Sequence, residues 1–216
     1  AGGLLAAASL NGQTVTCITA TRGEAGSQDL EKWPANKLGD VRQHELASAL
    51  KVLGISEHHL LDYPDGKCAD VDAKEAAERI AGYINKYQPD SIITFGPEGL
   101  TGHPDHIAIS CWVDAALKLA DTKPNVYHAV LTVNQYKDYL EAADLKLNLF
   151  YNIDQPPLVE DNACDICFCC TEELCACKHE ALASMPSQYG KMFEAFDHDY
   201  LKEVFRIEAF VRSDLK

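Results

Sequence analysis

The sequence lacks any apolar stretch of the roughly 18 residues that a membrane-spanning helix needs. Its apolar opening, Ala1–Leu10, is too short to span and has no basic residue before it. Basic side chains are also scarce, since 19 Lys and Arg stand against 33 Asp and Glu, for a net charge of -14. Binding to phosphate backbones requires concentrated Lys and Arg, so we expect neither a membrane span nor a nucleic-acid partner.

Other features are missing as well. No Gly-x-Gly-x-x-Gly follows a predicted strand, which disfavours a Rossmann-type nucleotide-binding protein. There is no internal repeat and no low-complexity linker. With 216 residues, 47% of them apolar, the chain can bury a sizeable core. We therefore predict a single α/β domain over residues 1–216, in which the part from about residue 135 to 216 is a C-terminal elaboration.

The cysteines bear on the cellular compartment. Nine is an odd number, so complete intramolecular pairing is impossible. Cys17, Cys68 and Cys111 stand alone in apolar surroundings, as buried reduced thiols do. We expect a reducing cytoplasm. The chain opens with Ala-Gly-Gly and no Met, so we expect either processing or a start that lies further upstream.

Hydrophobic patterns of helix and strand type alternate along the chain. They predict helices at Ala1–Leu10, Leu38–Leu53, Asp72–Tyr87 and His106–Leu119, and strands at Thr14–Thr19, His59–Tyr63, Asp90–Phe95 and Val126–Val133. Short connections between such elements indicate right-handed crossovers and a Rossmann-like, mostly parallel sheet with helices on both faces. Beyond residue 135 the pattern is weaker and predicts strands at Leu149–Ile153 and Asp165–Cys169, with helices at Glu172–Ser184 and Phe193–Phe196.

Two loops rich in polar groups follow predicted strands, Arg22–Gln28 and Gly96–His106. Ligands of such sheets bind beyond the carboxyl ends of the strands, which favours a site there. In the second loop, His103 and His106 are three residues apart and can face one pocket, and imidazole is the commonest zinc ligand. The alternative is a solvated loop in which Asp105 caps the following helix.

These motifs carry a resemblance to a known family. The segments Thr21–Ser27, Arg42–Leu46, Tyr63–Gly66 and Gly99–His106, followed by Lys178 and Ser187-Gln188, resemble in order the motifs of the LmbE/PIG-L zinc-dependent N-deacetylases. The resemblance covers the chain from Ala1 to about Gln188. It implies a Rossmann-like fold and the hydrolysis of an acetamide on an N-acetylglucosamine-like sugar conjugate, with Zn2+ as cofactor and a homo-oligomer as a possible assembly.

The resemblance also implies roles for individual residues. His106 takes the place of a zinc ligand, and His103 that of the group that stabilises the tetrahedral oxyanion. Asp105 takes the place of the carboxylate that orients and charges His103. Arg42 and Asp65 correspond to substrate contacts. Glu24 is expected to line the site, or alternatively to anchor its loop by hydrogen bonds.

One part of the family pattern is missing. The family's A-H-P-D-D-E motif, which supplies two metal ligands and the general base, is not present, and the chain opens with the residues that follow it in the family. We expect that motif and the first strand of the sheet to lie upstream of Ala1, which makes the chain a fragment of an active enzyme. The alternative is a catalytically inactive, truncated family member that acts as a sugar-binding or interaction module.

Six cysteines lie between Cys164 and Cys177, and their Cys-x-x-Cys spacing invites a second metal site. However, Cys167 and Cys169 alternate with apolar residues on a predicted strand. Cys175 and Cys177 lie two apart on a predicted helix, where side chains diverge. We favour a segment that is fortuitously Cys-rich or redox-sensitive over a structural zinc site.

Overall fold

The computed structural model describes residues 1–26 and 29–214. Residues 27–28, the end of the predicted loop at Arg22–Gln28, lie outside this range. The chain divides into two compact units. The first consists of Ala1–Asp65 and Phe168–Glu208, and the second of Gly66–Cys167 and the segment that starts at Ala209. The single domain expected from the sequence stays a prediction.

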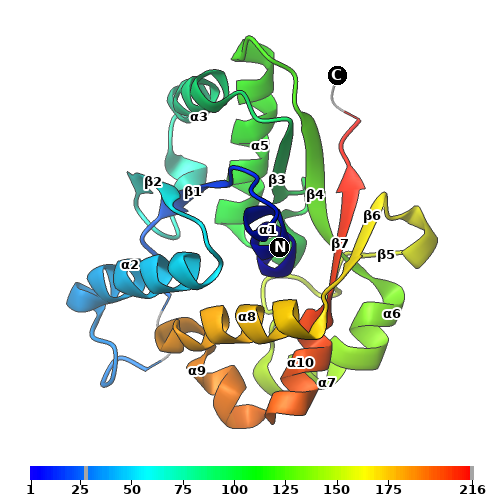
Figure 1. Ribbon diagram of the computed structural model, residues 1–216. Coiled ribbons are helices and arrows are strands. Elements are labelled where there is room, and N and C mark those ends of the chain that lie inside the picture. Colours follow the sequence, from blue (N-terminus) through cyan, green and yellow to red (C-terminus); the bar gives the residue numbers. More distant parts are fainter. Residues whose placement is uncertain (27–28, 215–216) are drawn as a thin grey trace. The chain divides into compact units, whose positions relative to one another are not determined.

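The first unit contains a two-stranded parallel sheet. Strand β1 (Thr16–Thr21) pairs with β2 (Glu57–Tyr63), and helix α2 (Ala35–Val52) lies between them in sequence (Figure 1). The predicted strand at Thr14–Thr19 is thus confirmed with a shift of two residues. Strand β1 ends where the polar loop at Arg22 begins, as the sequence predicted.

Four further helices complete the first unit: α1 (Gly2–Leu10), α8 (Glu172–Ala183), α9 (Pro186–Ala195) and α10 (His198–Arg206). Helix α1 packs on α8 through a small apolar cluster that contains Ala6, Cys170, Leu174 and Cys175. Cys170 lies so close to Gly3 that an added Cβ there would be 2.3 Å from its Sγ. Cys170 and Cys175, two of the six cysteines between Cys164 and Cys177, are therefore core residues.

A buried ion pair fastens the start of α1. The Glu208 carboxylate accepts hydrogen bonds from the backbone N–H groups of Gly3 and Leu4, at 2.9 and 2.8 Å. Its Oε1 lies 2.6 Å from the Lys178 Nζ, which also donates to the carbonyl of Phe205. A negative charge at a helix N-terminus is favourable, and the ammonium compensates the buried carboxylate.

Helices α8 and α10 face one another across a small cavity of about 140 Å³. Glu172 forms ion pairs with Lys202 and Arg206 there. At the other end, the rings of His179 and His198 lie 4.4 Å apart between centroids. Burial, together with the neighbouring His198, lowers the pKa of His179.

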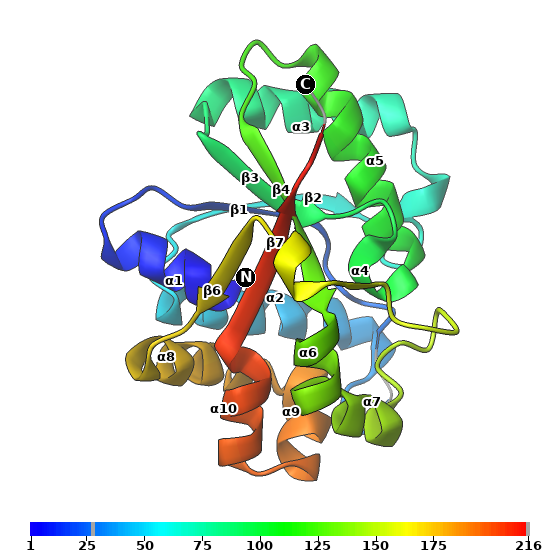
Figure 2. The same ribbon diagram turned by 90° about the vertical axis from the view of Figure 1, so that its right-hand side faces the viewer.

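The second unit is built on a mostly parallel sheet (Figure 2). Strands β3 (Ser91–Phe95) and β4 (Asn125–Thr132) are parallel, as are β4 and the short β5 (Leu158–Val159). Strand β7 (Ile207–Arg212) joins β4 in antiparallel register through its last residues, and β6 (Ile166–Cys169) follows β7 in the strand order. The α/β class and the mostly parallel sheet flanked by helices are confirmed.

Helices α3 (Ala73–Tyr87) and α5 (Pro104–Leu119) pack against each other, and α5 packs on β3. Asp72 caps α3, since its carboxylate accepts the N–H of Lys74 at 2.9 Å. The remaining elements are short: α4 (Gly99–Gly102), α6 (Val133–Gln135), α7 (Glu141–Leu147), and the turns η1 (Cys68–Asp70), η2 (Tyr136–Leu140) and η3 (Asp161–Ala163). Within the described residues, no helix is both long and apolar enough to cross a membrane.

Beyond residue 135, one predicted strand is wrong and one predicted helix is too short. Residues 149–153 form turns instead of a strand, because Asn148 ends α7 in a left-handed conformation (φ 52°) and Phe150 N–H donates to Asp144. Within residues 149–153, Phe150 is the buried apolar side chain, and its ring packs edge-on against that of Tyr136. The helix expected at Phe193–Phe196 is the end of the longer α9, which starts at Pro186. A proline is favourable in the first turn of a helix.

Candidate functional site

The polar loop after β3 winds tightly into the start of α5. Gly99, Leu100 and Gly102 all have positive φ values, of 70°, 61° and 69°. This backbone conformation is strained for leucine, and it persists only where the surrounding structure holds it in place, as happens most often at functional sites. At Gly102 an added Cβ would lie 2.1 Å from a side-chain carbon of Ile153, so only glycine fits.

This turn brings together the two histidines that the sequence singled out. The ring centroids of His103 and His106 are 5.0 Å apart. His106 stacks on Phe95, the last residue of β3, at 3.9 Å and an interplanar angle of 6°. Its Nδ1 lies 3.0 Å from the carbonyl oxygen of Gly99. A carbonyl can only accept, so Nδ1 carries the proton and the lone pair of the neutral ring is on Nε2.

His103 has the opposite tautomer. It is the N-cap of α5, and its Nδ1 accepts the backbone N–H of Asp105 at 3.2 Å. The proton of the neutral ring therefore sits on Nε2, which makes this atom a hydrogen-bond donor. The loop thus presents one imidazole as a metal ligand and the other as a donor.

Asp105 is buried, with 4% of its surface exposed. Its Oδ2 accepts the N–H of Gly66 at 2.7 Å, and its Oδ1 accepts the N–H of Cys68 at 3.0 Å. The alternative of a solvated capping residue is wrong, because His103 is the cap. Asp105 reaches His103 through its backbone N–H, and its carboxylate secures the loop at residues 66–68.

In the first unit, the structure brings together the three residues expected to bind substrate. Asp65 Oδ1 accepts the hydroxyl of Thr21 and Oδ2 the N–H of Ala25, at 3.1 and 2.9 Å. In return, the N–H of Asp65 donates to Glu24 Oε1 at 2.8 Å. The other Glu24 oxygen, Oε2, is buried and has no hydrogen-bond partner in the described structure.

Arg42 lies beside these groups and is held by several contacts. Its NH1 and NH2 donate to the carbonyls of Gly23 and Gly26 at 2.5 and 2.6 Å, and its Nε donates to Ser187 Oγ at 3.3 Å. Burial lowers the pKa of Arg42, while Asp65 and Glu45 raise it. Burial also raises the pKa of the Tyr189 hydroxyl, which the charge of Arg42 partly offsets.

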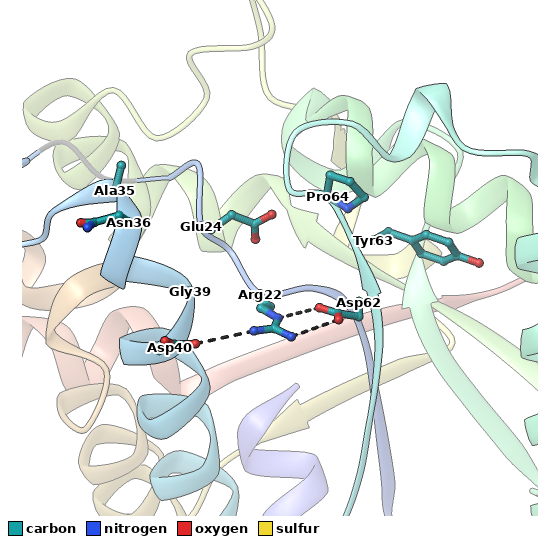
Figure 3. Close-up of a pocket in the computed structure, with 9 residues that line it drawn as sticks. All are labelled: Arg22, Glu24, Ala35, Asn36, Gly39, Asp40, Asp62, Tyr63 and Pro64. Carbon is teal, nitrogen blue, oxygen red and sulfur yellow. Dashed lines mark hydrogen bonds and ion pairs between the residues drawn. The ribbon is translucent and has the colours of Figure 1, made fainter.

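A pocket of about 350 Å³ opens beside Glu24, between the ends of β1 and β2 and the start of α2 (Figure 3). Arg22 lies in it, bonded through two nitrogens to Asp62 at 2.6 and 3.0 Å and paired with Asp40 at 3.6 Å. The sequence analysis missed these three residues. In the sequence, only their positions at the ends of two predicted strands and near the start of a predicted helix indicate a role for them in a pocket, and such positions are weak evidence.

No metal site is complete within residues 1–26 and 29–214: no group of three or more His, Cys, Asp or Glu side chains there is arranged to hold a metal ion. His106 has the arrangement of a ligand at the end of β3, since zinc-binding histidines usually donate their other N–H to a carbonyl or carboxylate. Catalytic zinc usually takes three protein ligands, so the described residues do not hold the ion by themselves.

Comparisons with known proteins identify one family. The family model PIG-L, described as GlcNAc-PI de-N-acetylase, matches residues 1–117. A 1D-myo-inositol 2-acetamido-2-deoxy-alpha-D-glucopyranoside deacetylase of Kineococcus radiotolerans is 32% identical over 137 residues, which cover 50% of this chain and 38% of the relative. The protein of that name from Saccharomonospora viridis is 30% identical over 151 residues, covering 60% and 56%. The chain thus spans about half the length, or less, of these relatives.

Solved structures show the same fold. The N,N'-diacetylchitobiose deacetylase of Pyrococcus horikoshii superposes with a TM-score of 0.63 at 18% identity, covering 98% of this chain and 77% of that one. The zinc inhibited form of the teicoplanin deacetylase Orf2 gives a TM-score of 0.67 at 15% identity, covering 100% and 94%. At such identities the likeness establishes the fold alone.

Proposed function

The chain belongs to the PIG-L family, and from this premise we propose that the protein is a metal-dependent amidohydrolase that removes the acetyl group from an N-acetylglucosamine-type sugar conjugate. The observation that carries the proposal lies within the family-matched region: Nδ1 of His103 accepts an N–H while Nδ1 of His106 faces a carbonyl oxygen, which assigns opposite tautomers to the two rings. Amide hydrolysis needs an activated water and a donor for the developing oxyanion. One ring is arranged for each task.

In this proposal His103 is the catalytic donor. Its Nε2 carries the donor proton, because Nδ1 accepts the N–H of Asp105. A donor aimed at an oxyanion contributes about 3–4 kcal/mol to lowering the barrier in known cases. Asp105 supports His103 by anchoring the turn on which that ring lies, and we keep it among the proposed catalytic residues.

His106 is the contribution of this chain to the proposed zinc site. Because the described residues supply one ligand, we derive no reaction step that passes through the ion. Glu24, Arg42 and Asp65 form the proposed substrate-binding cluster. The buried, unpartnered Oε2 of Glu24 beside a cavity supports this assignment, since a sugar hydroxyl can donate to it.

The test is acetate release from N-acetylglucosaminyl-inositol by the full-length protein, with bound zinc measured by elemental analysis. His103→Gln is expected to lower kcat about 10²–10³-fold with zinc retained. His106→Ala is expected to lose both zinc and activity. His44→Ala is the matched control, because His44 is exposed on α2 and bonds only a carbonyl of its own helix. Full activity of His103→Gln and His106→Ala would refute the assignment.

A second function is a sugar-binding or interaction module without catalysis. The lack of a three-ligand group in the described part of the chain favours it. Under this alternative the protein binds the N-acetylated sugar, contains no zinc and releases no acetate, so the same assays separate the two. Nine free cysteines support a reducing, cytoplasmic location as part of either proposal, and the homo-oligomer expected from the family stays a prediction.

A further inference from the structure

We propose that Glu45 and Ser187 are positioning residues that hold Arg42 as a clamp on the loop after β1, and that this clamp sets Glu24 for the substrate. The inference rests on the proposed function, in which Glu24 contacts the sugar. It gives Arg42 an action through the loop in addition to its place in the proposed substrate-binding cluster.

The first step is the attachment of Ser187 to Glu45. Ser187 lies in the first turn of α9, and its N–H donates to Glu45 Oε1 at 2.9 Å. Its hydroxyl donates to Glu45 Oε2 at 2.6 Å. Glu45 is 7% exposed, so this carboxylate is a buried charge placed at a helix N-terminus, where it is favourable. The hydroxyl proton is thereby committed to Glu45.

The second step is the orientation of Arg42. Since the Ser187 proton points to Glu45, the lone pairs of its Oγ are available to the Arg42 Nε–H at 3.3 Å. This contact fixes the plane of the guanidinium at its base. The two outer nitrogens then form a planar fork toward the loop.

The third step is the closure of the fork on the loop. NH1 and NH2 donate to the carbonyls of Gly23 and Gly26, the residues on either side of Glu24 and Ala25. Both ends of this turn are therefore bound to the same planar guanidinium. Both glycines are needed for this approach. An added Cβ at Gly23 would lie 2.8 Å from NH1, and one at Gly26 would lie 2.7 Å from it.

The consequence falls on Glu24. It lies between the two clamped carbonyls, and its Oε1 is bound to the N–H of Asp65, so its second oxygen has one defined position. Every guanidinium nitrogen of Arg42 already donates to protein. The guanidinium therefore shapes the wall that the substrate meets.

The experiment compares Ser187→Ala, Glu45→Gln and Arg42→Lys with the wild type, using full-length protein. Two readouts are taken: hydrogen exchange of the Ala25 amide, and kcat and KM for N-acetylglucosaminyl-inositol. We expect exchange to be about tenfold faster and KM about tenfold higher, the ratio for losing one hydrogen bond to a charged group, with kcat nearly unchanged. Arg79→Lys, at an exposed arginine of α3, is the control and should change neither readout.

A double-mutant cycle tests the contact itself. Gly26→Ala should speed Ala25 exchange in the wild type, because its methyl group displaces the guanidinium, and add little once Arg42→Ala has removed that group. Gly82→Ala, where an added Cβ meets nothing within 4 Å, is the matched control. Additive effects in the cycle, or wild-type exchange in Ser187→Ala, would overturn the clamp. A wild type without deacetylase activity would overturn the proposed function instead, and the exchange data would still decide the clamp.

Discussion

Replacing Asp105 with alanine should destabilise the second unit by about 3 kcal/mol, because its carboxylate accepts hydrogen bonds from the backbone N–H groups of Gly66 and Cys68. Cys68 is 0% exposed, so the variant removes a buried hydrogen bond from its N–H, at a cost of about 1–3 kcal/mol. Gly66 is exposed, and water replaces most of what its N–H loses. The lost charge in the first turn of α5 adds about 0.3–1 kcal/mol.

The assay is urea unfolding monitored by circular dichroism, with the free energy of unfolding extrapolated to water. Asp105→Asn keeps one acceptor oxygen for Cys68, so it should lose only about 1 kcal/mol. Asp72→Ala is the comparison, since it removes an exposed helix cap worth about 1 kcal/mol. If Asp105→Ala costs no more than Asp72→Ala, the carboxylate does not anchor the turn, and its burial must have another explanation.

Three further predictions concern packing and pH. Lys178→Met should lower the free energy of unfolding by about 3 kcal/mol in thermal or urea unfolding, because it removes the Lys178 ammonium from the buried Glu208 carboxylate, which keeps its hydrogen bonds from Gly3 and Leu4; a loss below about 1 kcal/mol would contradict the pair. Gly102→Ala should lower stability by more than about 1–2 kcal/mol, since a positive φ and an overlap with Ile153 add up; unchanged unfolding would show that the turn relaxes freely. The pKa of His179 is lower in the folded state than in the unfolded state, so the unfolded state binds more protons and the free energy of unfolding should fall as pH drops below about 6.5. His179→Gln should flatten this pH dependence in unfolding curves recorded from pH 7 to 5. An unchanged slope in that variant would assign the pH dependence to other groups.

Local chemistry made the turn at His103–His106 predictable from the sequence. Glycines, prolines and ionisable residues follow a β-branched run, and residues three apart at the start of a helix share a face whatever the rest of the chain does. The β1–β2 and β3–β4 pairs were predictable for the same reason, since alternating helix and strand patterns leave few topologies. The apolar run at Leu149–Ile153 was misassigned because a buried turn and a buried strand have the same short hydrophobic pattern.

The sequence by itself determined the family, the α/β class and which polar residues lie beyond the strand ends, because each depends on patterns within a few residues or on motif order. The tertiary structure alone decided what those residues do. Arg42 and Ser187 are 145 positions apart, and Asp105 and Cys68 are 37 apart. No local pattern encodes such pairings, since hydrogen bonds between distant segments depend on how the elements pack. In the structure Arg42 bonds two carbonyls of the loop after β1, and Asp105 accepts backbone N–H groups of the loop at residues 66–68. Nδ1 faces a carbonyl oxygen in His106 and accepts an N–H in His103.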